Sequence, residues 1–159
     1  MRPAPPLAVL AFLAAGCADA PEPAAAPPAP PAPPVAEAAS LAAADAYVRA
    51  APAGGVSAVF FRLENGTATP DTLVAARTDA ASRVQVHETT ESADGLRGMR
   101  EADRVAVPAG GAVAFEPGGL HVMLLDLRRG LAEGDTVDLA LDFAEGQTLA
   151  LRVPVRGLQ

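Results

Sequence analysis

The side chains of this sequence that could hold a metal ion are few and form one set. After position 17 the chain has only two histidines and two methionines, which are His87, Met99, His121 and Met123. Imidazole nitrogen and thioether sulfur are neutral donors, and thioethers suit soft Cu(I) better than hard Ca²⁺ or Mg²⁺. Zinc would use the histidines but is seldom bound by methionine. The donor set therefore predicts a copper site for one Cu(I) ion.

The spacing of these residues places them on strand faces. His121 and Met123 lie two apart in the apolar run Leu120–Leu124, so strand alternation puts both side chains on one face. His87 ends the alternating run Arg83–His87 on its polar face, which is unusual for a core residue and natural for a ligand near a rim. A single methionine more often fills a gap in a core, and a single histidine is often a satisfied surface or core residue. The prediction therefore depends on whether these strands converge.

Strand and turn signals fill the chain from residue 41 onward. Short runs of apolar and β-branched residues are broken by glycine, proline and tight-turn pairs such as Asn65-Gly66, and no window shows a long helix of period 3.6. This pattern predicts an all-β fold, an antiparallel β-sandwich or barrel over residues 41–159. The expected strands are Ala46–Arg49, Val56–Leu63, Thr72–Ala76, Arg83–His87, Gly95–Arg100, Arg104–Val107, Ala112–Phe115, Leu120–Leu127, Thr136–Phe143 and Thr148–Val155.

The spacing of the four candidate ligands resembles that of a known family. Eleven residues separate His87 from Met99, and twenty-one more precede the His121-x-Met123 pair. This signature resembles that of the PCuAC family of periplasmic copper(I) chaperones. Surrounding residues are similar as well, and the resemblance covers residues 44–157. The matching segments are Ala46–Ala50, Val86–Glu88, Gly118–Leu124 and Pro154–Arg156.

The resemblance implies a cupredoxin-like Greek-key sandwich with a Cu(I) site near solvent. It also implies delivery of copper to respiratory oxidases, notably to their dinuclear copper centre, with another copper chaperone as a possible recipient. Two departures stand out. Glu88 occupies a position where many relatives have a further methionine, and the chain ends at Leu158-Gln159 without the His- and Met-rich tail of some relatives. We therefore expect a single copper site. We also expect the protein to be a monomer.

The first forty residues predict export and attachment to a membrane. Arg2 precedes a short apolar stretch, and Leu13-Ala14-Ala15-Gly16-Cys17 resembles the bacterial lipobox, in which the cysteine receives the lipid. An ordinary secretory signal with an incidental cysteine is the alternative. We expect residues 1–17 to be a lipoprotein signal segment and residues 18–40 an Ala/Pro-rich disordered linker. The anchor would face the periplasm, with the outer membrane favoured because no aspartate directly follows Cys17.

Charge and composition narrow the other possibilities. The formal charge of −7 argues against nucleic acid as a partner, because phosphate binding needs clustered cations. No Ser/His/Asp or paired-carboxylate spacing predicts an enzyme. A blue-copper protein would need a cysteine ligand, and the single cysteine is the expected lipid acceptor. The remaining alternative is a metal-free structural or adhesive envelope lipoprotein, in which His87 and Met99 would lie far from His121.

Overall fold

The computed structural model describes residues 40–157, which belong to a compact unit of residues 37–159. No helix able to cross a bilayer occurs in this range, which holds only strands, turns and irregular segments. Cys17 and the expected signal segment and linker lie outside the described residues. The ten strands, each at a position where alternation and turn signals predict one, are β1 Leu41–Arg49, β2 Ser57–Asn65, β3 Asp71–Arg77, β4 Ala81–Glu91, β5 Arg97–Glu101, β6 Val105–Val107, β7 Ala112–Phe115, β8 Leu120–Leu127, β9 Thr136–Phe143 and β10 Thr148–Arg156.

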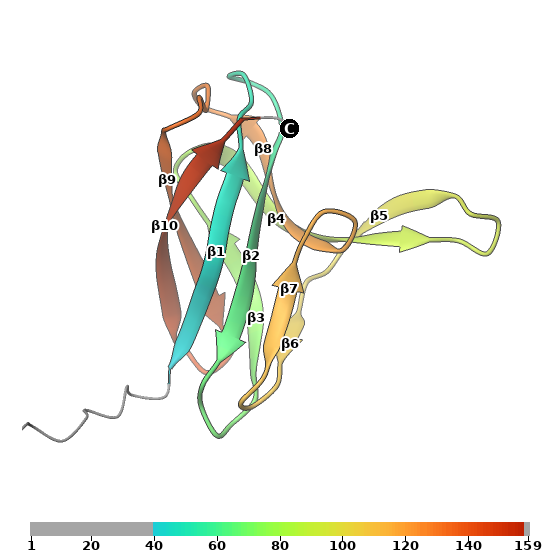
Figure 1. The fold of residues 1–159 in the computed structure, drawn as a ribbon, viewed down its shortest axis with the longest axis vertical. Coiled ribbons are helices and arrows are strands. Elements are labelled where there is room, and N and C mark those ends of the chain that lie inside the picture. The colour runs from blue at the N-terminus through green and yellow to red at the C-terminus, as the bar shows by residue number, and fades with distance from the viewer. Residues whose placement is uncertain (1–39, 158–159) are drawn as a thin grey trace, which may run out of the picture. The chain divides into compact units, whose positions relative to one another are not determined.

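The strands pair into one mixed sheet that folds over a single core (Figure 1). The order is β5-β4-β8-β7-β2-β1-β10-β9-β3-β6, with a further pairing of β8 with β2. Most pairings are antiparallel, while β1 pairs with β10 and β7 pairs with β8 in parallel. The predicted all-β class is confirmed. Alternation along a strand predicts which face each side chain takes but not which strand it pairs with. The two parallel pairings could therefore not be predicted.

The core is built mainly from valine and leucine, as the scarcity of aromatic residues suggests. Val48 and Val59 of β1 and β2 pack in the same buried cluster as Leu73 of β3 and Leu139 of β9. Burying each such side chain contributes roughly 1.5–3 kcal/mol. A stacked pair of Phe61 and Phe115 adds aromatic contact, with ring centroids 4.3 Å apart. This core fixes the strands that carry the candidate ligands.

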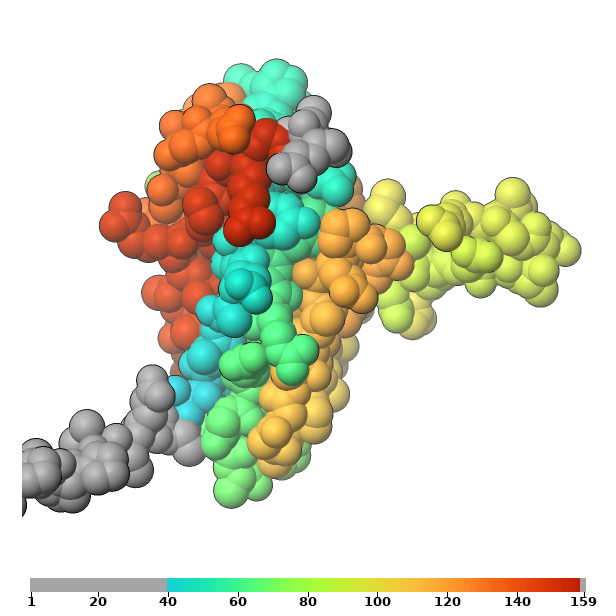
Figure 2. All heavy atoms as spheres, in the orientation of Figure 1, coloured from blue at the N-terminus to red at the C-terminus, as the bar shows by residue number. Residues whose placement is uncertain are grey.

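The β4–β5 hairpin differs from the prediction made for β4. His87 was expected at the end of its strand, but β4 continues to Glu91 and pairs with β5 from His87 onward. Figure 2 shows the hairpin as an arm that stands clear of the remaining strands. All of β5 is exposed, and the pairing is supported by ion pairs such as Arg97 with Glu91. The extension was missed because Glu88–Glu91 contains no apolar residue and therefore shows no alternation to detect.

Asn65 ties the β2–β3 turn to the core by using its whole amide. Its side chain is 1% exposed. The Nδ2 group donates to the carbonyl oxygens of Thr69 at 2.9 Å and Val107 at 3.3 Å. The Oδ1 atom accepts from both the backbone N–H and the hydroxyl of Thr67, at 2.9 and 2.6 Å. The predicted turn residue is therefore a buried hydrogen-bonding hub.

Replacement of Asn65 by alanine should destabilise the fold. Asn65→Ala leaves buried backbone groups without partners, and we expect the free energy of unfolding to fall by about 2–4 kcal/mol. Urea unfolding followed by circular dichroism measures this change. Thr69→Ala is the control, because the Thr69 side chain is exposed, and its effect should stay within about 0.5 kcal/mol. Equal stability of the two variants would contradict this role of Asn65.

Candidate metal centre

The pairing of β4 with β8 brings two of the four candidate ligands together. In this antiparallel register His87 stands directly opposite His121, and Gln85 stands opposite Met123. Directly opposed residues point to the same face of a sheet, and residues two apart share that face. His87, His121 and Met123 therefore lie on one face.

The pairing of β4 with β5 adds the fourth candidate. Thr89 stands opposite Met99, and His87 stands opposite Glu101. Since Thr89 is two residues from His87, Met99 belongs to the same face as the histidines. The Glu101 carboxylate also lies on this face, where it accepts a hydrogen bond from the Gln85 side chain at 2.9 Å. The three strands β5, β4 and β8 thus present all four candidate ligands in one direction.

The two imidazole rings are neighbours across the strand pair. Their centroids are 6.0 Å apart, and their planes make an angle of 57°. His121 is 7% exposed, and its Nδ1 atom lies 3.1 Å from the carbonyl oxygen of Gly119. Because a carbonyl only accepts, Nδ1 of the neutral ring carries the proton, and Nε2 retains the lone pair that a metal needs. The Gly119 carbonyl also accepts the N–H of Thr89 at 3.1 Å, which fixes it between the two strands.

His87 has no partner for either of its ring nitrogens. Nδ1 and Nε2 are both buried, and neither has a hydrogen-bond partner in the structure. A buried polar group left without a partner costs about 1–3 kcal/mol. Such a group in a native fold calls for an explanation, and a bound ion is one of the few available. A metal ion bound to His87 would therefore supply the partner that its ring nitrogens lack in the metal-free structure.

The two methionines open onto a hollow beside the rings. Met99, His121 and Met123 line a cavity of about 410 Å³ together with Phe60 and Arg49. Met99 is 60% exposed, whereas Met123 is partly buried. Both thioethers and the His121 ring therefore face a space that is accessible from solvent. His87 does not line this hollow, but its ring centroid lies 6.0 Å from that of His121, which does.

The donor set fits a soft monovalent cation. It offers two imidazoles and two thioethers, and none of these groups is an anion. Within residues 40–157, no three His, Cys, Asp or Glu side chains converge as a zinc or calcium site would require. Glu88, which follows His87, points to the other face of β4, and Arg100 donates to its carboxylate at 2.6 Å. Copper(I) remains the ion whose preferences match the side chains present.

Three residues of the site region were not predicted from the sequence as site residues. Gly119 orients His121 through its backbone carbonyl, Phe60 places its ring 6.3 Å from the His121 ring, and Arg49 lines the hollow from β1. Phe60 and Arg49 come from strands far from the ligands in the chain. Only the three-dimensional pairing of β1, β2 and β8 brings them close. The Gly118-Gly119 turn was the one available hint.

Comparison with known proteins places this architecture in a family. The family model described as "Putative lipoprotein LpqE-like" matches residues 41–155, which is almost the whole described domain. The chain belongs to the LpqE-like family. A curated relative, "Putative lipoprotein Lxx21020" of Leifsonia xyli, is 36% identical to this LpqE-like chain over 112 residues. The match covers 70% of the chain and 66% of the relative, so the chain spans just under two thirds of that protein's length.

Several solved structures have the same fold, and some of their titles name copper. The apo PCuAC domain from PmoF1 superposes on the LpqE-like chain with a TM-score of 0.63 at 23% identity, covering 74% of this chain and 94% of that domain. DR1885 of Deinococcus radiodurans, in its apo form, gives a TM-score of 0.58 at 33% identity over 86% of this chain and 95% of its own. The Cu(I) form of DR1885 also matches, at 30% identity. The predicted resemblance to the PCuAC family and its cupredoxin-like fold is confirmed.

The unpartnered state of His87 leads to a test on the metal-free protein. We expect His87→Phe to raise the free energy of unfolding by up to about 2 kcal/mol, because it removes two buried groups without partners and keeps a planar ring at the position. His121→Phe is the matched control. It loses the bond to Gly119 and should lower stability by about 1 kcal/mol. Urea unfolding in the presence of a copper chelator measures both, and a destabilising His87→Phe would contradict the arrangement described.

Proposed function

We propose that this chain is an envelope copper chaperone that binds one Cu(I) ion through His87, Met99, His121 and Met123. The observation that carries the proposal is His87: both of its ring nitrogens are buried without hydrogen-bond partners, and the residue stands opposite His121 across the β4–β8 pair. Thioether sulfur is available on the same face from both methionines. The fit of residue type, face and burial supports copper as the cargo of this fold. The Cu(I) form of the 30% identical DR1885 supports it further.

Differences in burial between the ligands suggest how copper would leave. His121 is 7% exposed, while Met99 is 60% exposed and lies on the projecting hairpin. The imidazoles would hold the ion from the protein side, and Met99 would be the first ligand to be displaced. An incoming donor of a partner then replaces Met99, and the remaining ligands follow one at a time. A partner with thiolates would draw Cu(I) onward, because thiolate is the stronger soft ligand.

The recipient in this proposal is another protein of the envelope. A copper-accepting subunit of a cytochrome oxidase, or a second copper chaperone, fits the PCuAC resemblance. The chain would reach that recipient as a monomer from a lipid anchor on Cys17, through the Ala/Pro-rich segment of residues 18–40. Both features lie outside the described residues. The lipoprotein descriptions of the family and of the Leifsonia relative support the anchor.

Anaerobic titration with Cu(I) against a chromophoric chelator tests the binding claim. The protein is the chain from residue 17 to 159 with Cys17→Ser, which removes a thiol that would itself bind Cu(I). We expect one tight equivalent. Loss of a supporting residue around a metal typically lowers affinity about 10–100-fold, so loss of a ligand in His121→Ala should weaken binding by at least about 100-fold.

Two further variants sharpen the assignment. Met99→Ala should weaken binding less than His121→Ala, because the Met99 side chain is exposed and exchangeable. Thr89→Val is the control. Thr89 lies opposite Met99 on the same face but offers no soft donor, so the Cu(I) affinity of this variant should match that of the parent. Failure of the parent to compete with the chelator would contradict the proposal. Undiminished binding by His121→Ala would contradict the ligand set.

A further inference from the structure

Two arginines lie side by side at one end of the sheet. Arg49 of β1 and Arg156 of β10 are direct partners in the parallel pairing of these strands. Their backbones are fixed, because the carbonyl of Arg156 accepts the N–H of Ala50 at 2.8 Å and the carbonyl of Arg49 accepts the Ser57 hydroxyl at 2.6 Å. Both side chains are exposed. Two cationic groups are therefore held next to each other at the surface.

Aromatic rings orient both guanidinium groups. The Arg156 guanidinium carbon lies 4.6 Å from the Tyr47 ring centroid, and that of Arg49 lies 5.3 Å from the Phe60 centroid. Tyr47 and Phe60 pack against each other with centroids 5.2 Å apart. Stacking on an aromatic face restricts the guanidinium while its N–H groups stay free to donate. The pair is thus preorganised for an acceptor.

This pair lacks the anionic partners that most other arginines of the domain have. Of the eleven arginines in residues 40–157, seven have a carboxylate oxygen within 4.0 Å, and Arg49 and Arg156 are not among them. The whole chain has 19 acidic residues against 12 basic ones, so carboxylates are not scarce. Adjacent like charges repel each other, and an external anion would relieve that repulsion.

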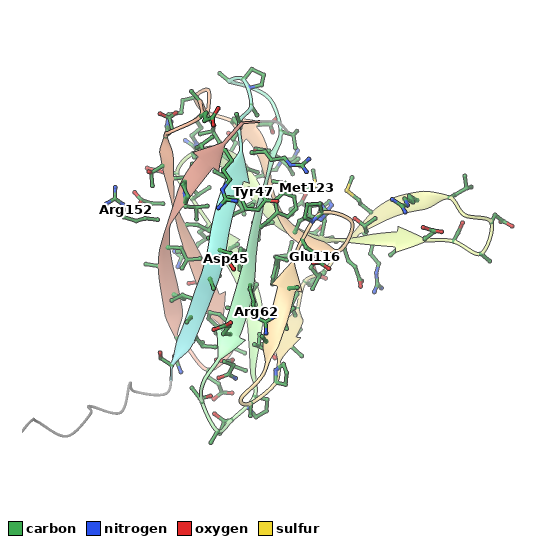
Figure 3. All side chains as sticks on the ribbon, in the orientation of Figure 1. Asp45, Tyr47, Arg62, Glu116, Met123 and Arg152 are labelled. Atoms are coloured by element: carbon green, nitrogen blue, oxygen red, sulfur yellow. The ribbon has the colours of Figure 1, made fainter. Side chains whose placement is uncertain are left out.

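The arginine pair is continuous with the candidate metal centre. A hollow of about 260 Å³ is lined by Tyr47, Arg49, Arg156 and Gly157. Arg49 also lines the larger hollow that holds Met99, His121 and Met123. Phe60, which packs against Tyr47, also lines the larger hollow. Figure 3 labels Tyr47 on β1 and Met123 among the side chains of this domain. A molecule seated on the two guanidinium groups would therefore border the hollow that Met99 and Met123 line.

We infer that Arg49 and Arg156 form a docking site for an acidic segment of the protein that exchanges copper with this chain. Carboxylates match the bidentate geometry of guanidinium. A protein segment fits better than a small anion, because the site is open and runs on toward the methionines. The net charge of −7 would repel an acidic partner elsewhere, so docking here also sets its orientation. The copper-exchanging identity of the partner rests on the proposed function, whereas the acidic chemistry of the site does not.

Tyr47 provides the readout, because it is the single tyrosine of a chain without tryptophan and it stacks under Arg156. The metal-free chain, residues 17–159 with Cys17→Ser, is titrated with a hexaglutamate peptide while Tyr47 fluorescence is recorded. We expect a saturable change that weakens at least about tenfold when NaCl rises from about 20 to about 300 mM, because salt screens exposed charges. Hexaglutamine should produce no such change. Since no copper is present, failure to bind copper in the earlier titration would leave this result intact.

Matched variants separate local docking from overall charge. Arg49→Gln/Arg156→Gln should weaken hexaglutamate binding at least about tenfold, with Arg156→Gln intermediate, because a charge-assisted bidentate contact is lost at each position. Arg62→Gln/Arg152→Gln removes the same total charge from exposed ion pairs elsewhere and should bind like the parent. Circular dichroism checks that each variant is folded. Equal binding by the two double variants would overturn the inference, as would equally tight binding of free glutarate at the same carboxylate concentration.

Discussion

The antiparallel register between β4 and β8 is the constraint on which the candidate site depends. It sets His87 opposite His121, and Met123 takes its place two residues farther along β8. A slip of one residue would turn every side chain of one strand to the other face. The register is held because Val122 and Leu124, which alternate with the ligands on β8, are completely buried in the core. The alternation along β8 that packs Val122 and Leu124 in the core therefore also sets His121 and Met123 on the opposite face.

The sheet face that carries the candidate ligands has features that do not stabilise the metal-free fold. The core side of β8 carries the buried Val122 and Leu124. The face of the candidate ligands carries His87 of β4, whose ring nitrogens are buried without partners, and Met99 of β5, which is 60% exposed. Neither feature helps the metal-free fold. Both are expected of a binding site, since function retains groups that packing alone would replace. Support comes from around the site: the Gly119 carbonyl orients His121, and the Phe60 ring covers one side of the hollow.

Much of the fold could be predicted from the sequence, since alternation and turn residues marked each of the ten strands. The end of β4 could not be predicted, because Glu88–Glu91 contains no apolar residue and is held by strand pairing and ion pairs. For the site, the sequence supplied the four residue types and the shared face of His121 and Met123. It could not supply the opposition of His87 and His121, which depends on register. Arg49 and Arg156 stand in segments that resemble the PCuAC family, but their adjacency could not be predicted, because the parallel pairing joins the first and last strands of the domain.

X-ray absorption spectroscopy of the Cu(I)-loaded protein tests the central claim most directly. In residues 17–159 with Cys17→Ser, Met99 and Met123 supply the only sulfur atoms, so any copper–sulfur scattering identifies them. We expect a monovalent copper edge with two imidazole nitrogens and two sulfurs in the inner shell. A shell of nitrogen and oxygen alone, or one without imidazole, would contradict it.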